Sequence, residues 1–201
     1  MKTSSTPETN DVRETILSNG QRIMAGKGFS AVGINEILTA SGVPKGSFYH
    51  YFGSKDAFGE AMLEEYFRDY LAEIDATLAA PGKTMAQRLM TYWQNWQDSQ
   101  SFFECQGKCL AVKLGAEVAD LSEAMRLALK RGTTGITDRL ARAIEIGVEE
   151  GSFSVDTSPT TAAQSLYQLW LGASVMVKIV RSTKPFETAL TTTRQILHLP
   201  L

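Results

Sequence analysis

Apolar residues recur every three or four positions along most of the chain, the spacing of helices that each bury one face. A long stripe of this kind contains Phe58, Met62, Phe67, Tyr70 and Ile74. No window combines alternating apolar and polar residues with hairpin turn signals. The pattern therefore predicts an all-α protein.

Glycine, proline and serine residues divide this pattern into separate helices. The first apolar stripe, from Val12 to Met24, ends at "GKGF", and Ser54 is a good N-cap for the long helix after it. The later breaks are "APGK", "QGK", "GSFSVDTSP" and "STKP". We expect the following helices at about 33–40, 45–52, 54–80, 84–104, 108–117, 119–150, 159–182 and 185–198.

Composition is that of a soluble globular protein, with 43% hydrophobic and 21% charged residues. The apolar run from Ser165 to Val180 is short for a membrane span and contains Lys178. We therefore expect a cytoplasmic protein with no membrane association. Residues 1–55 hold six basic and four acidic residues, a net charge of +2, whereas the whole chain has a net charge of −2. This asymmetry favours contact between the N-terminal part and phosphates.

Two short predicted helices joined by "SGV" have the layout of a helix-turn-helix, whose second helix enters the DNA major groove. We expect Phe48 and Phe52, four positions apart, to anchor this second helix to the core. Its hydroxyl and ammonium groups suit phosphates, and its tyrosines suit sugar edges. For Tyr49 and His50 we favour DNA contact over simple packing.

The stretch "GINEILTASGVPKGSFYHYFGSKDAF" resembles the signature of TetR/AcrR-family repressors. The polar start of the chain indicates a flexible arm over residues 1–9. The resemblance implies a DNA-binding domain over 10–55 that continues into helix 54–80, and a helical regulatory and dimerisation domain over 56–201. It also implies a double-stranded, palindromic DNA operator. The residues that match the family's DNA-contacting positions are Lys45, Gly46, Ser47, Tyr49, His50, Tyr51 and Lys55.

The C-terminal half is rich in large aromatic residues, which suit either a helical core or a pocket for a small apolar or aromatic molecule. Packing is the more common role of any one of them. The pocket candidates are Trp93, Trp96, Phe103, Tyr167 and Trp170. The helices expected at 159–182 and 185–198 are apolar on most sides, which predicts a homodimer formed through them. The family resemblance implies the same placement.

Both cysteines of the chain, Cys105 and Cys109, lie in the stretch "CQGKCLAVKLGAEV". Two cysteines without nearby histidines do not make a metal site, and we expect neither a metal nor a cofactor. Buried packing is the ordinary role of a free cysteine. Alternatively, a predicted helix N-terminus and the neighbouring Lys108 and Lys113 favour the thiolate of Cys109, as a sensing cysteine requires. Local chemistry leaves these two roles open.

The segments "KCLAVKLGAEVADLSEAMR" and "LWLGASVMVKIVRS" resemble the NemR-type branch of the family, whose members release DNA when electrophiles or oxidants reach a cysteine. The resemblance assigns the sensor role to Cys109 and places Lys178 where that branch has a lysine. Lys178 suits a thiolate partner, although solvent exposure or pairing with Glu117 is equally compatible. Cys105 matches no family position and is either a resolving thiol or a packing residue.

The resulting hypothesis is a homodimeric repressor that leaves its operator when Cys109 is modified. An alternative is a repressor induced by reversible binding of a small apolar or aromatic ligand. An enzyme is disfavoured, because the sequence has no phosphate-binding glycine loop, no GxSxG motif and no nucleophile–base pair.

Overall fold

The computed structural model describes residues 8–99 and 110–200, and these residues form helices and connecting segments without a strand. The all-α prediction is confirmed. The helices are α1 (Glu8–Lys27), α2 (Ile34–Ser41), α3 (Lys45–Phe52), α4 (Lys55–Leu78), α5 (Met85–Ser99), α6 (Leu110–Leu121), α7 (Glu123–Glu149), α8 (Pro159–Val180) and α9 (Lys184–Ile196).

Side-chain caps fix several of these boundaries. The Ser54 hydroxyl accepts a hydrogen bond from the Ala57 N–H at 3.1 Å, which confirms the expected start of α4. The expected boundary between helices 108–117 and 119–150 was wrong. α6 continues to Leu121, and α7 begins only after Ser122, whose hydroxyl accepts from the Met125 N–H.

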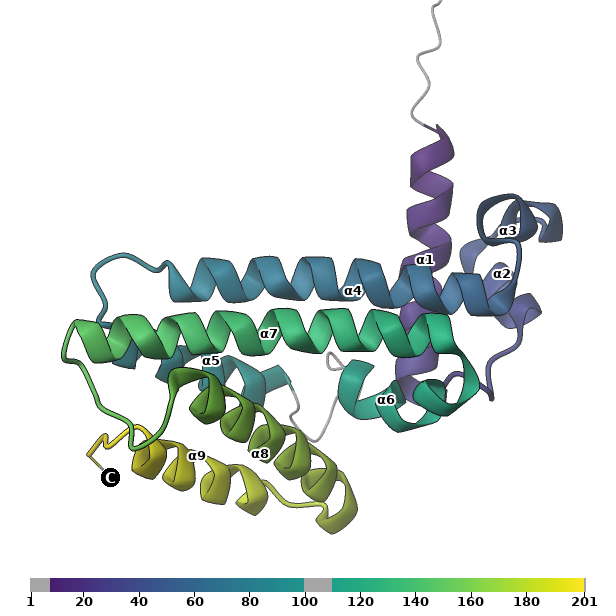
Figure 1. Ribbon diagram of the computed structural model, residues 1–201. Coiled ribbons are helices and arrows are strands. Elements are labelled where there is room, and N and C mark those ends of the chain that lie inside the picture. The colour runs from purple at the N-terminus through teal and green to yellow at the C-terminus, as the bar shows by residue number, and fades with distance from the viewer. Residues whose placement is uncertain (1–7, 100–109, 201) are drawn as a thin grey trace, which may run out of the picture.

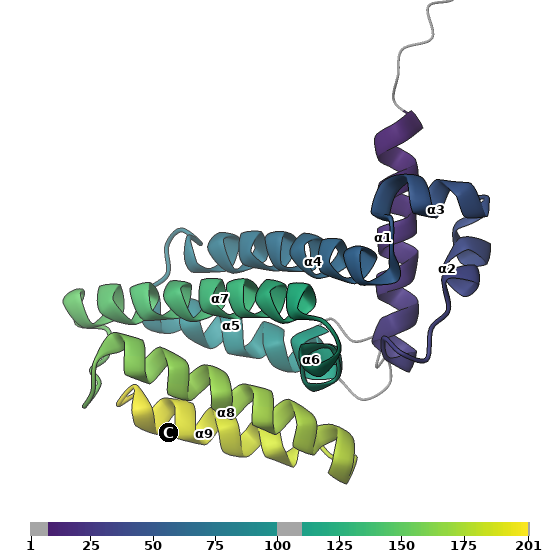
Figure 2. The same cartoon turned by 45° about the vertical axis from the view of Figure 1, so that its right-hand side comes forward.

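The helices form two regions of different shape (Figures 1 and 2). Helices α1 to α3 make a small head at one end of the molecule, and α4 runs from this head along the whole body. In the body, α4 lies beside α7, and both run away from the head. The C-terminus lies at the end of the body that is distant from the head.

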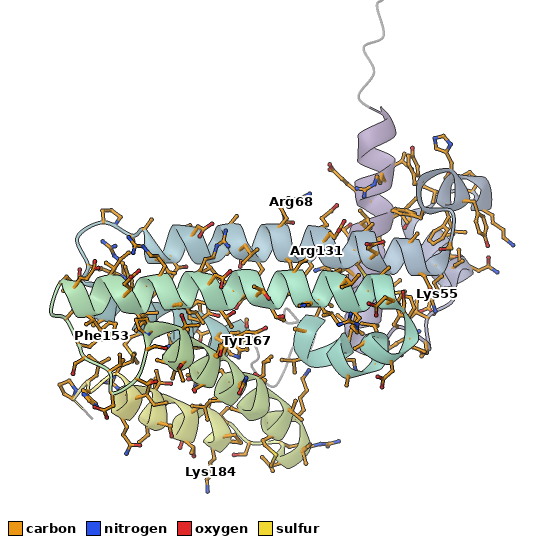
Figure 3. All side chains as sticks on the ribbon, in the orientation of Figure 1. Lys55, Arg68, Arg131, Phe153, Tyr167 and Lys184 are labelled. Atoms are coloured by element: carbon orange, nitrogen blue, oxygen red, sulfur yellow. The ribbon has the colours of Figure 1, made fainter. Side chains whose placement is uncertain are left out.

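Close packing and charge pairs hold α4 against α7. A Cβ placed on Gly132 of α7 would lie 2.1 Å from Cγ of Phe67 in α4, so the two helices approach closely only because position 132 has no side chain. The Arg139 guanidinium binds both carboxylate oxygens of Asp75 at 2.7 and 2.9 Å. Arg131, labelled in Figure 3, pairs with Glu64 at 2.7 Å.

Helices α8 and α9 form a further layer below α7 and α5 (Figure 1). α7 packs against α8, and α8 packs against α9. The core contains apolar residues from all of these helices, including the fully buried Trp93, Trp170 and Phe186. Among the helices of the described residues, none is long and apolar enough to cross a membrane.

Candidate DNA-binding interface and sensing region

Helix α3 is anchored to the head by one apolar face. The chain turns between α2 and α3 at Gly42 and Val43, where the Val43 N–H donates to the Leu38 carbonyl at 3.2 Å. Phe48 and Phe52 are buried, and their rings lie 5.3 and 5.1 Å from the ring of Phe58 in α4. The predicted anchoring role of these two phenylalanines is confirmed, and the opposite face of α3 is left to solvent.

The outward face of α3 carries most of the predicted DNA contacts. Tyr49 is 47% exposed although it is a large apolar ring, and Figure 2 shows α3 in the upper part of the head, above α2 and above the level of α4. The residues of this face are exposed, except for two that are half-buried, Ser47 and Tyr51. The exposed residues are Lys45, Gly46, Tyr49 and His50. The structure therefore brings these six residues to one accessible surface, where their contact with DNA stays a prediction.

Lys55 differs from the other predicted contacts because it is turned towards the junction of head and body (Figure 3). Its ammonium donates to the Phe29 carbonyl at 2.8 Å and lies 4.5 Å from the centroid of the Phe29 ring. Burial lowers the pKa of Lys55 below its usual value, and the charges of Glu117 and Asp56 oppose this only in part. Since an ammonium has three donors, a phosphate contact remains compatible with this position.

Glu117 of α6 connects the body to the head at the same junction. Its two carboxylate oxygens accept hydrogen bonds from the backbone N–H groups of Phe29 and Ser30 at 3.1 and 2.7 Å. Burial acts to raise the pKa of Glu117, but the hydrogen bonds from Ser30 and Phe29 and the charge of Lys55 together outweigh it, so the pKa is lowered. Sequence reasoning considered Glu117 only as a partner for Lys178 and missed these contacts.

Four of the five pocket candidates come together in one aromatic cluster between α5 and α8. Trp93 stacks on Trp170 with centroids 4.8 Å apart, and Trp96 meets Tyr167 edge to face at 5.8 Å. All four are buried. The fifth candidate, Phe103, lies outside the described residues.

Buried hydroxyl groups satisfy two of the three indoles. Trp96 Nε1 donates to Ser174 Oγ, and Trp170 Nε1 donates to Thr193 Oγ1, each at 2.9 Å. Ser174 is almost completely buried. Trp93 Nε1 is also buried, and it donates to no residue of the described ranges.

The proposed sensor residues are only partly within the described ranges. Cys105 and Cys109 both lie outside them, and Leu110, the first residue of α6, is fully buried. Lys178 is exposed near the C-terminal end of α8. No group of three or more His, Cys, Asp or Glu side chains within residues 8–99 and 110–200 is arranged to hold a metal ion.

The C-terminal half of α8 exposes an apolar surface. Ile179 is 68% exposed, and its neighbours Val175, Met176 and Val180 are each more than 40% exposed. Single exposed apolar residues are ordinary, but a group on one helix face is typical of an interaction site. We call these four residues the α8 apolar surface.

A small helical head that presents the second helix of a helix-turn-helix, joined to an all-helical body, defines a DNA-binding transcriptional regulator. The family described as "Bacterial regulatory proteins, tetR family" matches residues 16–62. The family described as "Tetracyclin repressor-like, C-terminal domain" matches residues 86–193. The chain therefore belongs to the TetR family.

Relatives support this assignment over nearly the whole chain. The repressor NemR of Escherichia coli K12 is 40% identical over 190 residues, which are 94% of this chain and 96% of NemR. The repressor DhaR of Mycobacterium sp. GP1 is 32% identical over 90% of this chain and 89% of its own. The crystal structure of reduced E. coli NemR matches with a TM-score of 0.89 and 41% identity, covering 94% of this chain and 98% of that one. The chain is thus a NemR-like member of the family.

Proposed function

We propose that this chain is a homodimeric repressor that binds a palindromic operator through α3 and leaves it when Cys109 is modified by an electrophile or an oxidant. The observation that carries the proposal is the similarity to NemR through both the head and the body, at 40% identity. TetR-family repressors bind operator DNA and are typically dimers. The exposed hydroxyl, imidazole and ammonium groups of α3 can form hydrogen bonds with the phosphates and sugars of double-stranded DNA.

The α8 apolar surface supports dimerisation through α8 and α9. Its four large apolar residues would lose contact with water in a two-fold contact between two copies, and two-fold symmetry suits two DNA half-sites. Ile179→Glu places a charge at the most exposed of these positions. We expect monomers by analytical ultracentrifugation, whereas Val148→Glu, a change of another exposed apolar residue at the end of α7, should leave the dimer intact. A stable dimer of Ile179→Glu would contradict this interface.

The proposed sensing chemistry is a change at one sulfur atom. With an electrophilic alkene, the Cys109 thiolate forms a bond to one carbon of the double bond, the π bond breaks, and its electron pair moves to the other carbon, which takes a proton from water. With hypochlorous acid, the thiolate is oxidised to a sulfenic acid while hypochlorous acid is reduced to chloride. Because Lys178 is a cation on α8, it is the candidate that stabilises the thiolate in the reduced state.

The decisive experiment measures operator binding with purified protein in three conditions: reduced, after a stoichiometric oxidant or electrophile, and after dithiothreitol. We expect wild type to release DNA and to recover from the oxidant, and Cys109→Ser to stay bound throughout. Cys105→Ser is the matched control, and a full response in that variant would exclude an obligatory disulfide. Release of Cys109→Ser by the same treatment would refute the assignment of the sensor to Cys109.

A second candidate is induction by a small apolar or aromatic ligand at the aromatic cluster. The observation that favours it is the buried Trp93 indole, whose N–H donates to no described residue and would donate a hydrogen bond to a ligand oxygen. The mutual stacking of Trp93 and Trp170 and the paired indoles of Trp96 and Trp170 favour a filled core. A ligand sensor should keep its response in Cys109→Ser, which separates the two candidates.

A further inference from the structure

The end of α1 forms a receptor for a carboxylate. Gly28 has φ = +94°, a conformation that favours glycine, and the two N–H groups that follow it point to the same side. Successive backbone N–H groups of this kind bind anions. A Cβ at Gly28 would also lie 3.0 Å from Glu117 Oε2, so a larger residue there would crowd the bound carboxylate.

Lys55 completes this receptor with a positive charge. Its ammonium is held by the Phe29 carbonyl and the Phe29 ring, and it interacts electrostatically with Glu117. The Lys55 side chain is thus fixed by the same residue whose N–H binds the carboxylate. The two amides therefore bind the carboxylate through hydrogen bonds that its charge strengthens, and Lys55 adds a positive charge that favours the carboxylate electrostatically.

We propose that the N–H groups of Phe29 and Ser30, together with Lys55, form a carboxylate-binding site that Glu117 of α6 occupies, and that this bond holds the head in the orientation that binds the operator. We call it the Glu117 latch. It adds a direct link between α6 and the end of α1 to the contacts that the head makes with α4. The role in operator binding rests on the proposed function.

The other supports of the head explain why such a latch matters. The head also rests on α4, through the packing of Phe58 against α3 and against Gly20 of α1, and through Arg13, which pairs with Glu65 at 3.5 Å. All of these contacts lie on one helix, within its first half, so they leave the head free to turn about that helix. The latch lies on a different helix, beside the lower end of α1 in Figure 2, and a second point of attachment removes this freedom.

Hydrogen exchange tests the carboxylate site without reference to DNA or to the cysteines. In wild type the amides of Phe29 and Ser30 should be protected, and in Glu117→Ala they should exchange faster while the core amides of α7 keep their rates. Acetate replaces the atoms that this substitution removes, so acetate should restore protection where chloride at equal ionic strength does not. Unchanged exchange of the two amides in Glu117→Ala would overturn the site.

Operator binding by the reduced protein tests what the latch does. We expect Glu117→Ala to bind about fivefold or more weakly than wild type, in the range typical of coupling between sites, and acetate to restore binding in this variant alone. Glu117→Gln keeps one acceptor oxygen in the same shape and should fall between the two. Asp120→Ala removes the same charge from an exposed position of the same helix and serves as the control.

The outcomes separate the latch from the cysteine sensor. Equal or tighter operator binding by Glu117→Ala, compared with Asp120→Ala, would overturn the latch, whatever the cysteines do. If wild type keeps its operator after Cys109 is modified, the sensing proposal fails, and the reduced-state comparison still decides the latch. If both proposals hold, Glu117→Ala should also show a smaller ratio of reduced to modified affinity than wild type, because a broken link transmits less.

Discussion

Replacement of Ser174 by alanine tests whether the aromatic cluster is a fixed part of the core. The Ser174 hydroxyl accepts from Trp96 Nε1 at 2.9 Å and donates to the Trp170 carbonyl at 2.8 Å, and it is almost completely buried. Ser174→Ala therefore leaves the indole N–H of Trp96 in the core without its acceptor. The carbonyl of Trp170 keeps its hydrogen bond within the α8 backbone and loses only the additional bond from the Ser174 hydroxyl.

The expected cost follows from the group that is left unpaired. A buried donor without a partner costs about 1–3 kcal/mol, and the better helix propensity of alanine offsets only about 0.5 kcal/mol. We therefore expect a loss of about 2 kcal/mol in the free energy of unfolding. For a chain of this length that is a decrease of about 4–8 °C in Tm.

Thermal and urea unfolding at a fixed protomer concentration measure this cost, with tryptophan fluorescence as the signal. Ser165→Ala, at an exposed position of the same helix, is the control and should change stability by less than about 0.5 kcal/mol. In a Trp96→Phe background the donor is absent, so Ser174→Ala should cost much less. A change no larger than the control, or an equal cost in both backgrounds, would refute the role of the Ser174 hydroxyl as the acceptor for Trp96.

Three further predictions concern the helix contact, the latch and the DNA surface. Gly132→Ala should destabilise the protein by about 1–3 kcal/mol in urea unfolding because its Cβ would meet the Phe67 ring, whereas Gly115→Ala, which faces open space, should not. The pKa of Glu117 is lowered in the folded state, so the stability that its carboxylate contributes is complete at pH values above the usual carboxyl pKa and is lost as the pH falls through the lowered pKa. The urea midpoints of wild type and Glu117→Gln should therefore differ at neutral pH and converge only at a pH below the lowered pKa. Lys45→Ala should weaken binding to the operator and to unrelated DNA by the same factor. It should also reduce by about one the slope of log affinity against log salt concentration, as expected for the loss of a phosphate contact.

Local signals made the helices and the head predictable. The i, i+4 spacing of Phe48 and Phe52 identified the buried side of α3. The remaining side of the helix was therefore predicted to face DNA. Ser54 marked the start of α4 through a cap that depends on residues only three positions apart. The equivalent cap at Ser122 was overlooked, although "SEAM" shows a serine followed by an acidic residue in the first turn, and the boundary of α7 was therefore placed too early.

Contacts between distant residues were not predictable in the same way. Glu117 binds amides 87 and 88 positions away, and a backbone N–H has no sequence signature, so nothing distinguished this glutamate from its neighbours. Likewise, the aromatic residues indicated a core or a pocket, but the sequence does not reveal which indoles find a buried hydroxyl. Ser174 is the acceptor for Trp96, but a serine within an apolar helix carries no signal of the indole that it will bind.

The geometry of α6 gives a reason why a small change beside Cys109 should reach the head. Leu110, Leu114 and Val118 are fully buried, and α6 packs against α7 while also touching α1 and α8, so a displacement at its beginning moves the helix as one body. Glu117 lies seven residues after Leu110, which is about 10 Å along the helix axis. Its hydrogen bonds to the N–H groups of Ser30 and Phe29 are 2.7 and 3.1 Å long, so a shift of about 0.5 Å away from them would stretch the first to the limit of normal hydrogen-bond length and the second beyond it. The packing of Phe58 against α1 and α3 is non-directional and depends less on exact distance than a hydrogen bond does, and we therefore expect α6 to release the head before α4 moves.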